Sequence, residues 1–216
     1  MAQRRLPTVL ADFSRSLQEC RQLADDAYLW ASPGASGSRP YISEKRRDHL
    51  TETAFLHAFL AWEGFVEESF ILYLSGQRPP RGRAPSRYAF PPNHRTAMDW
   101  VLPEDGDYTT WTVPSRVSKR AERFFKDGRP FSPVLRSNQS TLDEVRTIRN
   151  AIAHKSQSAR EKFEKLVRAK LRTLPAKLDV GGFLATTAPG TSPPISFLEH
   201  YFAKIDSAAQ QIVPPR

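Results

Sequence analysis

Residues 43–75 read SEKRRDHLTETAFLHAFLAWEGFVEESFILYLS and carry a regular apolar pattern. Large apolar side chains recur there every three or four residues, which is the repeat of one face of an α-helix. They are Phe55, Phe59, Trp62, Val66, Phe70 and Tyr73. Ser43 has a hydroxyl that can cap the start of a helix, and Gly76 follows its end. We therefore expect one long helix from about residue 43 to residue 75 with a buried apolar face.

The same spacing predicts further helices along the chain. They are expected at about 8–30, 115–126, 141–155, 158–172 and 196–213. Stretches 32–40, 127–133 and 181–194 are rich in Gly, Pro, Ser or Thr and are expected as connections. No strand or hairpin pattern persists for long. The sequence therefore predicts an all-α helical bundle.

Residues 77–114 interrupt this pattern with seven prolines, which exclude a long helix there. We interpret the stretch as a long proline-rich insertion within a single domain that spans 1–216 and ends in the helix at 196–213. Aromatic residues alternate with arginines in it: Tyr88, Trp100, Tyr108 and Trp111 with Arg83, Arg87 and Arg95. Such aromatic rings either stack on unpaired bases or pack the insertion onto the bundle, and the sequence leaves both readings open.

Composition excludes several classes of protein. Of the 216 residues, 39% are hydrophobic, which is enough for a core and excludes a wholly disordered chain. Cys20 is the single cysteine, so neither an intrachain disulfide nor a zinc site with several cysteines is possible. The longest apolar run outside the termini is Phe70–Leu74, far below the roughly 20 residues of a membrane helix. We expect a soluble, cytoplasmic protein without a membrane partner.

Positive charge is concentrated in one segment. The formal net charge is +9, and residues 115–177 contain 17 Lys and Arg against 6 Asp and Glu. A local charge of +11 favours a polyanionic partner such as nucleic acid, because neutralising phosphates releases condensed counterions. The alternative is a solvated basic face that aids solubility.

Within that segment, residues 146–155 read RTIRNAIAHK. On an ideal helix Leu142, Val145, Ile148 and Ile152 cluster on one side, whereas Asp143, Arg146, Asn150 and His154 share the other. Asn150 and His154 are four residues apart and are therefore neighbours. Arg149 lies about 140° from His154 around the helix axis. One regular helix therefore cannot point both side chains at one phosphate.

Arg149-Asn150-Ala-Ile-Ala-His154 resembles the R-x(4–6)-H motif of the HEPN superfamily (higher eukaryotes and prokaryotes nucleotide-binding). Ala61-Trp-Glu63-Gly-Phe65 is similar to the acidic residue among aromatics that is common on a long helix before that motif. The resemblance implies a small helical bundle, and it implies a ribonuclease that acts as a toxin or antiviral effector. It also implies a homodimer in which two motifs face each other, so that both Arg149 side chains converge with both His154 rings on one cleft.

The residue types suit RNA cleavage by attack of a 2′-hydroxyl on the adjacent phosphate. This reaction needs no metal or other cofactor, but it needs a proton acceptor, a proton donor and stabilisation of extra negative charge. His154 supplies a group that exchanges protons near neutral pH. Arg149 offers a planar fork of donors to the phosphate oxygens. Asn150 either orients His154 or binds a phosphate oxygen.

The supporting residues Glu63 and Arg146 and the neighbouring Ser156 point to a function less specifically than the motif residues do. Glu63 is expected to pair with Arg149 or Arg146 and to fix the site, or else to be an ordinary surface carboxylate. Ser156 either contacts phosphate or, in the preferred reading, ends the helix. His49, His57 and His200 lack the spacing and the cysteine partners of a zinc site, so no metal is expected.

These residues predict a HEPN-like endoribonuclease, a hydrolase of the toxin–antitoxin or antiviral-defence type, restrained by an antitoxin or a sensor protein. The alternative is a non-catalytic HEPN module that binds nucleotide or RNA and dimerises within a larger complex. The simplest alternative is a solvated helix face whose cations lie near the helix C-terminus, where the helix dipole favours them.

Overall fold

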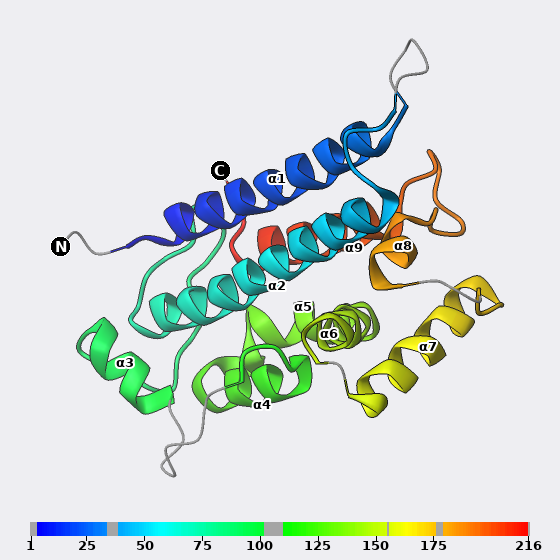
Figure 1. Cartoon of the computed structure of the whole chain (residues 1–216). Coiled ribbons are helices and arrows are strands. Elements are labelled where there is room, and N and C mark those ends of the chain that lie inside the picture. Colours follow the sequence, from blue (N-terminus) through cyan, green and yellow to red (C-terminus); the bar gives the residue numbers. More distant parts are fainter. Residues whose placement is uncertain (1–3, 34–38, 102–109, 155, 176–178, 216) are drawn as a thin grey trace. The chain divides into compact units, whose positions relative to one another are not determined.

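The computed structural model describes residues 4–33, 39–101, 110–154, 156–175 and 179–215. Helices account for all the regular structure in these ranges, which contain two isolated bridges and no strand of a sheet. The helices are α1 Leu6–Ala31, α2 Glu44–Leu74, α3 His94–Val101, α4 Pro114–Phe124, α5 Phe131–Ser137, α6 Gln139–Ala153, α7 Gln157–Leu171, α8 Val180–Ala185 and α9 Phe197–Ile212, with a 3-10 turn, η1, at Lys126–Gly128 (Figure 1). The predicted all-α class is confirmed.

The chain forms two compact units. The first comprises residues 1–15, 61–143 and 204–216, and the second comprises residues 16–60 and 144–203. Helices α1, α2, α6 and α9 each contribute residues to both units. The organisation of 1–216 as a single domain stays a prediction.

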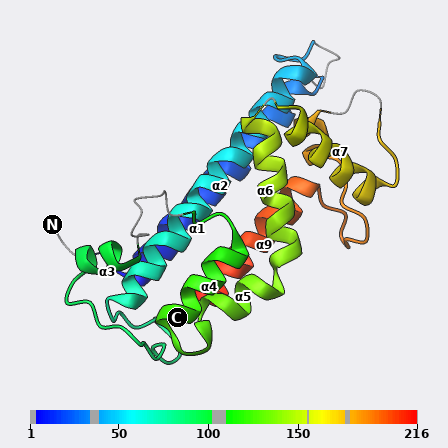
Figure 2. The ribbon, with the colours of Figure 1, turned by 90° about the horizontal axis from the view of Figure 1, so that it is seen from below.

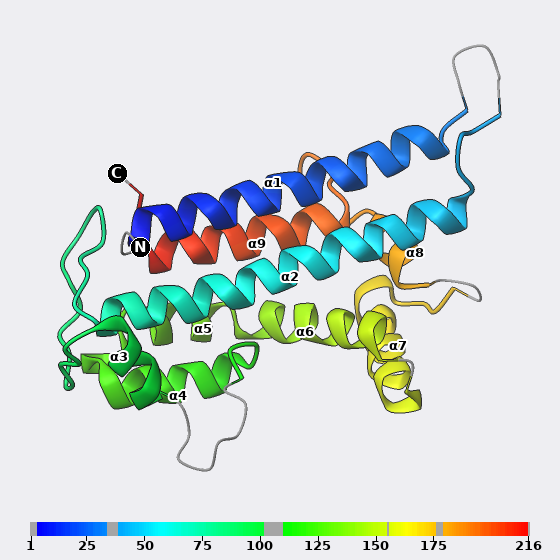
Figure 3. The same cartoon turned by 60° about the vertical axis from the view of Figure 1, so that its left-hand side comes forward.

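The core of the first unit is built around Phe70 of α2. Its ring centroid lies 5.0–6.2 Å from those of Trp111, Phe124, Phe125 and Phe131. These rings come from the segment before α4, from the end of α4 and from α5, which Figure 3 shows beside the second half of α2. The aromatic cluster therefore holds α4 and α5 against the long helix.

The core of the second unit is also aromatic. Phe55 of α2 packs on Tyr201 and Phe202 of α9, with centroids 6.3 and 6.4 Å apart. Phe183 of α8 stacks on Phe197 at 4.5 Å. These contacts join α2, α8 and α9 in one apolar layer.

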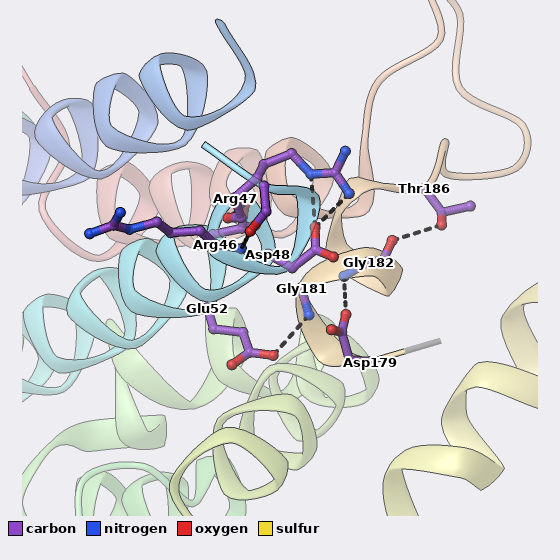
Figure 4. Close-up of polar contacts among 10 residues, drawn as sticks. Arg46, Arg47, Asp48, Glu52, Asp179, Gly181, Gly182 and Thr186 are labelled. Carbon is purple, nitrogen blue, oxygen red and sulfur yellow. Dashed lines mark hydrogen bonds and ion pairs between the residues drawn. The ribbon is translucent and has the colours of Figure 1, made fainter. Parts of the chain in front are cut away.

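Helix α8 packs closely on α2. The Gly181 amide donates to the Glu52 carboxylate at 3.1 Å, and the Gly182 amide donates to Asp179, which caps α8, at 2.7 Å (Figure 4). A Cβ atom at Gly181 would lie 2.3 Å from the backbone oxygen of Asp48. Only glycine permits this approach of the two backbones.

Three connections differ from expectation. Residues 131–133, expected in a connection, form the first turn of α5, where Pro133 is tolerated because amides of the first turn have no helical partner. The expected 181–194 loop begins with α8. The proline-rich stretch contains the short helix α3, between His94 and Val101. The long helices begin and end within about two residues of the predicted positions; Lys155, the predicted end of the motif helix, lies outside the described residues.

Among the described residues, no helix has both the length and the apolar character needed to cross a bilayer.

Candidate functional site

Helix α6 presents the residues of the predicted motif. Its apolar positions Leu142, Val145 and Ile148 are all at most 4% exposed, which confirms the predicted buried face; Ile152 is only half-buried. The helix ends at Ala153, and the amide of His154 still donates to the Asn150 carbonyl at 2.9 Å. Helix α7 follows after a short connection (Figure 2). The exposed His154 side chain therefore stands at the C-terminal end of α6.

A pocket of about 230 Å³ lies at this connection, within the second unit. We call it the α6–α7 pocket. It is lined by Arg146, Thr147, Asn150, His154, Ser156, Ser158, Ala159 and Lys162. Three residues predicted from the sequence, Arg146, Asn150 and His154, thus share one concave surface.

Arg149 occupies a different place. It does not line the α6–α7 pocket, and its guanidinium lies over the Phe59 ring, 5.3 Å from the centroid. Its Nη1 donates to Asn150 Oδ1 at 2.9 Å. The angular separation expected on a regular helix is therefore present in the fold. Arg149 therefore contacts the pocket only indirectly, by its hydrogen bond to the lining residue Asn150.

This hydrogen bond defines what Asn150 offers to a ligand. An amide side chain has one acceptor oxygen and one NH₂ donor group. Because Oδ1 accepts from Arg149, the orientation of the amide is fixed and Nδ2 is the group left to donate. A donor next to Arg146 suits an anion.

The charge of the pocket also favours an anion. Its lining includes the cations Arg146 and Lys162 and no carboxylate. Helix α7 begins at the same place, with Ser156 as N-cap; the Ser156 hydroxyl accepts from the Ala159 amide at 3.3 Å. The N-terminus of a helix adds partial positive charge and amide donors. The α6–α7 pocket can therefore hold a phosphate-sized group.

Sequence reasoning missed the contribution of α7. Ser156 was expected to end the preceding helix, but it caps the start of the next one. Ser158 and Lys162 were not singled out, although both line the pocket. The signal that could have identified them is the N-cap serine at the start of an amphipathic helix, directly after the motif.

Glu63 belongs to the first unit, where it lies half-buried on α2. Its pairing with Arg149 or Arg146 stays a prediction.

The aromatic residues of the proline-rich stretch divide into two groups. Trp111 is buried, packs on Phe70 and lies under the Arg120 guanidinium at 4.6 Å, so the packing reading holds for this residue. Tyr88 and Trp100 are exposed. Tyr108 lies outside the described residues.

Other reactive groups do not form a site. Across the described ranges there is no group of three or more His, Cys, Asp or Glu side chains placed to hold a metal ion. Cys20 is buried, and burial raises the pKa of its thiol to about 11, which disfavours the reactive thiolate.

Comparison of the chain with protein-family models, with curated proteins and with solved structures finds no match.

Proposed function

We propose that this chain is a metal-independent endoribonuclease with a HEPN-type site at the α6–α7 pocket. The observation that carries the proposal is the meeting of Arg146, Asn150 and His154 with Lys162 in one pocket whose lining has no carboxylate. A phosphodiester is an anion of the size and charge that such donors hold. The exposed imidazole of His154 adds a group for proton transfer at neutral pH.

In the proposed reaction the RNA 2′-oxygen forms a bond to the adjacent phosphorus, and the bond from phosphorus to the 5′-oxygen breaks. One imidazole takes the proton of the 2′-hydroxyl, and a second proton donor protonates the leaving 5′-oxygen. The products are a 2′,3′-cyclic phosphate and a 5′-hydroxyl. Arg146, Lys162 and the Asn150 amide neutralise the additional charge of the phosphorane.

Each chain contributes one His154, whereas the reaction uses a proton acceptor and a proton donor. A homodimer supplies the second imidazole, which agrees with the dimer that the resemblance implies. Arg149 has a different part in this scheme from the one expected from the motif. It holds Asn150 in position, and we treat it as a positioning residue.

The cellular part of the proposal is a toxin or antiphage effector. An enzyme that cleaves RNA in its own host needs restraint, so an antitoxin or a sensor protein is the expected partner. The placement of Arg149 against Phe59 favours one alternative, a module that binds RNA or nucleotide without cleaving it.

The test is incubation of the purified chain with total RNA in excess EDTA, followed by analysis of the fragment ends. We expect 2′,3′-cyclic phosphate ends with the native chain and none with His154→Ala. The matched control is His57→Ala, because His57 is exposed on α2 of the same unit and lies outside the α6–α7 pocket. Equal cleavage by all three proteins would overturn the site, and RNA binding without cleavage would favour the non-catalytic module.

A further inference from the structure

The first unit contains a second, larger concavity. It measures about 680 Å³ and is formed by three stretches of chain, the loop 79–86, the turn 126–133 and residues 211–214, together with Tyr73 of α2. We call it the basic cavity. All its lining residues belong to the first unit.

Four cations line the basic cavity. Arg81 and Arg83 come from the loop, and Lys126 and Arg129 come from the turn. All four are exposed, and none is paired with a carboxylate of the described chain. Asp127 is the single acidic residue among the lining residues, so the cavity has a clear excess of positive charge.

Much of the rest of the lining is apolar and includes five prolines. The buried residues Tyr73 and Ile212 also belong to it, joined by a hydrogen bond from the tyrosine hydroxyl to the Ile212 carbonyl at 2.7 Å. A volume of 680 Å³ lies within the range of roughly 300–1,000 Å³ that small-molecule and nucleotide-sized ligands occupy. Cations beside proline rings suit a ligand that carries both phosphates and an apolar ring.

Backbone hydrogen bonds hold the two cationic walls together. The Lys126 amide donates to the Ser86 carbonyl and the Tyr88 amide donates to the Phe124 carbonyl, both at 2.9 Å. Arg87 donates to the Leu74 carbonyl at 2.6 Å, which fixes the loop to the end of α2. The spacing of the walls is therefore set before a ligand arrives, which lowers the entropy cost of binding.

Exposed aromatic rings follow the loop directly. Tyr88 is 62% exposed and Phe90 is 67% exposed, and the Arg87 guanidinium lies over the Phe90 ring at 4.9 Å. Neither ring lines the basic cavity. A ligand that uses both the cations and these rings must extend beyond the cavity, which favours a strand over a free nucleotide.

We propose that the basic cavity is a binding site for single-stranded RNA, in which Arg81, Arg83, Lys126 and Arg129 each contact a backbone phosphate and a neighbouring base stacks on Tyr88. The proposal extends the proposed function, because it gives the substrate a contact in addition to the α6–α7 pocket. Its test uses a strand that cannot be cleaved, so its failure is separate from a failure of the ribonuclease proposal.

The experiment measures binding of a fluorescent 2′-O-methyl oligouridine to the full chain by anisotropy over a series of salt concentrations. Each phosphate contact with a single strand contributes about 0.7 to the salt exponent, or about fivefold in affinity at 0.1 M salt. The Arg81→Ser/Arg83→Ser variant should therefore bind about 25-fold more weakly, with a salt slope smaller by about 1.4. Lys126→Ser/Arg129→Ser should give the same result from the opposite wall.

The matched control is Arg116→Ser/Arg123→Ser, which removes the same charge from exposed positions of α4 outside the cavity. It should change the affinity by less than about threefold, since distant exposed charges are screened. An equal loss in the control would reduce the effect to net charge and overturn the proposal. Unchanged binding in both cavity variants would also overturn it. So would tight binding of ATP or tripolyphosphate in the cavity that the oligonucleotide does not displace.

Discussion

The α6–α7 pocket and the basic cavity both gather cations, but they differ in what accompanies the charge. The α6–α7 pocket is small and contains His154 beside an oriented amide donor. The basic cavity is about three times larger, and its lining has four Lys and Arg side chains, five prolines and no histidine. Lys and Arg bind phosphate but do not exchange protons near neutral pH, whereas histidine does. The comparison therefore separates the site proposed to cleave RNA from the site proposed to hold the strand.

The two sites also differ in how they are built. In the α6–α7 pocket the key residues come from the adjoining ends of two helices that are consecutive in the chain. In the basic cavity they come from a loop, a turn and the C-terminal region, which are brought together by tertiary structure. Positions on helices are more rigid than positions on loops, and chemistry demands the greater precision.

The largest expected effect tests the difference in chemistry. His154→Ala should lower the rate of RNA cleavage by about 10²- to 10⁴-fold, because it removes the proton-transfer group. Its affinity for the 2′-O-methyl strand should change by less than about threefold, since most of the phosphate contacts come from Lys and Arg side chains that the substitution leaves in place. Cleavage kinetics and anisotropy on the same preparations measure both quantities. A His154→Ala protein that loses binding as strongly as cleavage would remove the distinction between the two sites.

The next effect concerns Arg149. Arg149→Met keeps an unbranched stem against Phe59 but cannot donate to Asn150. A hydrogen bond with a charged donor contributes about 1.5–3 kcal/mol, so kcat should fall by about 10- to 100-fold while KM changes little. Arg149→Lys, which retains a donor, should recover part of kcat, and a purely structural role would give no such recovery.

Steady-state kinetics with a short RNA substrate measure this split between kcat and KM. Arg168→Met is the control, because Arg168 is exposed on α7 and does not line the pocket. A rise in KM with kcat unchanged would place Arg149 in direct contact with the substrate instead.

Parts of this arrangement could be predicted from the sequence. The helices at 44–74 and 197–212 were predicted to within one residue, because long apolar patterns of helical period leave little choice of boundary. Helix α8 was missed: its two glycines oppose helix formation, and it depends on the Asp179 cap and on its close approach to α2. The helix propensities of residues 180–185 do not reveal this contact with α2.

The two sites also differ in how far a local sequence pattern predicts them. Asn150 and His154 could be placed together because they are separated by one helical turn, and the placement of Arg149 followed from its angle on the helix. Lys162 joins them only because α7 turns back at Ser156. The basic cavity combines Arg81, Lys126 and Ile212, which are at least 45 residues apart, and no local pattern links them.

A pair of glycine variants should disturb one region each. At Gly128, φ is +64°, and an added Cβ would lie within 2.0 Å of the Ser132 hydroxyl; at Gly181 it would meet the Asp48 backbone at 2.3 Å. Each Gly→Ala variant should lower the free energy of unfolding by about 1–3 kcal/mol, as forced overpacking does. Gly128→Ala moves the turn between Lys126 and Arg129 and should weaken strand binding.

Thermal unfolding and hydrogen exchange measure this effect by region. Faster exchange should appear around η1 and α5 in Gly128→Ala and around α8 in Gly181→Ala. Gly190→Ala is the control, because φ is also positive there, at +77°, and no atom lies within 4 Å of the added Cβ, so only the backbone strain remains; Gly190 lines neither the basic cavity nor the α6–α7 pocket. Faster exchange at α8 in Gly128→Ala would show that the two regions are not stabilised separately.

The smallest expected effect separates stability from catalysis in the pH profile. Burial raises the pKa of the Glu52 carboxyl above its ordinary value; Asp179 and Asp48 add to the shift, while the Gly181 amide and His49 oppose it. The folded state therefore prefers the protonated carboxyl, so the stability from this group is fully present below the ordinary carboxyl range and is lost as the pH rises through the raised pKa.

Glu52→Gln keeps an acceptor for Gly181 without the charge. It should be more stable than the native chain by less than about 1 kcal/mol at pH 7, and the difference should vanish at about pH 4, near the unperturbed carboxyl pKa. Thermal unfolding from pH 4 to 7 measures the difference, with the exposed Glu19→Gln as control. If Glu52→Gln leaves the pH dependence of cleavage unaltered, that dependence does not come from the titration of Glu52; a parallel shift of cleavage and stability would assign it to Glu52.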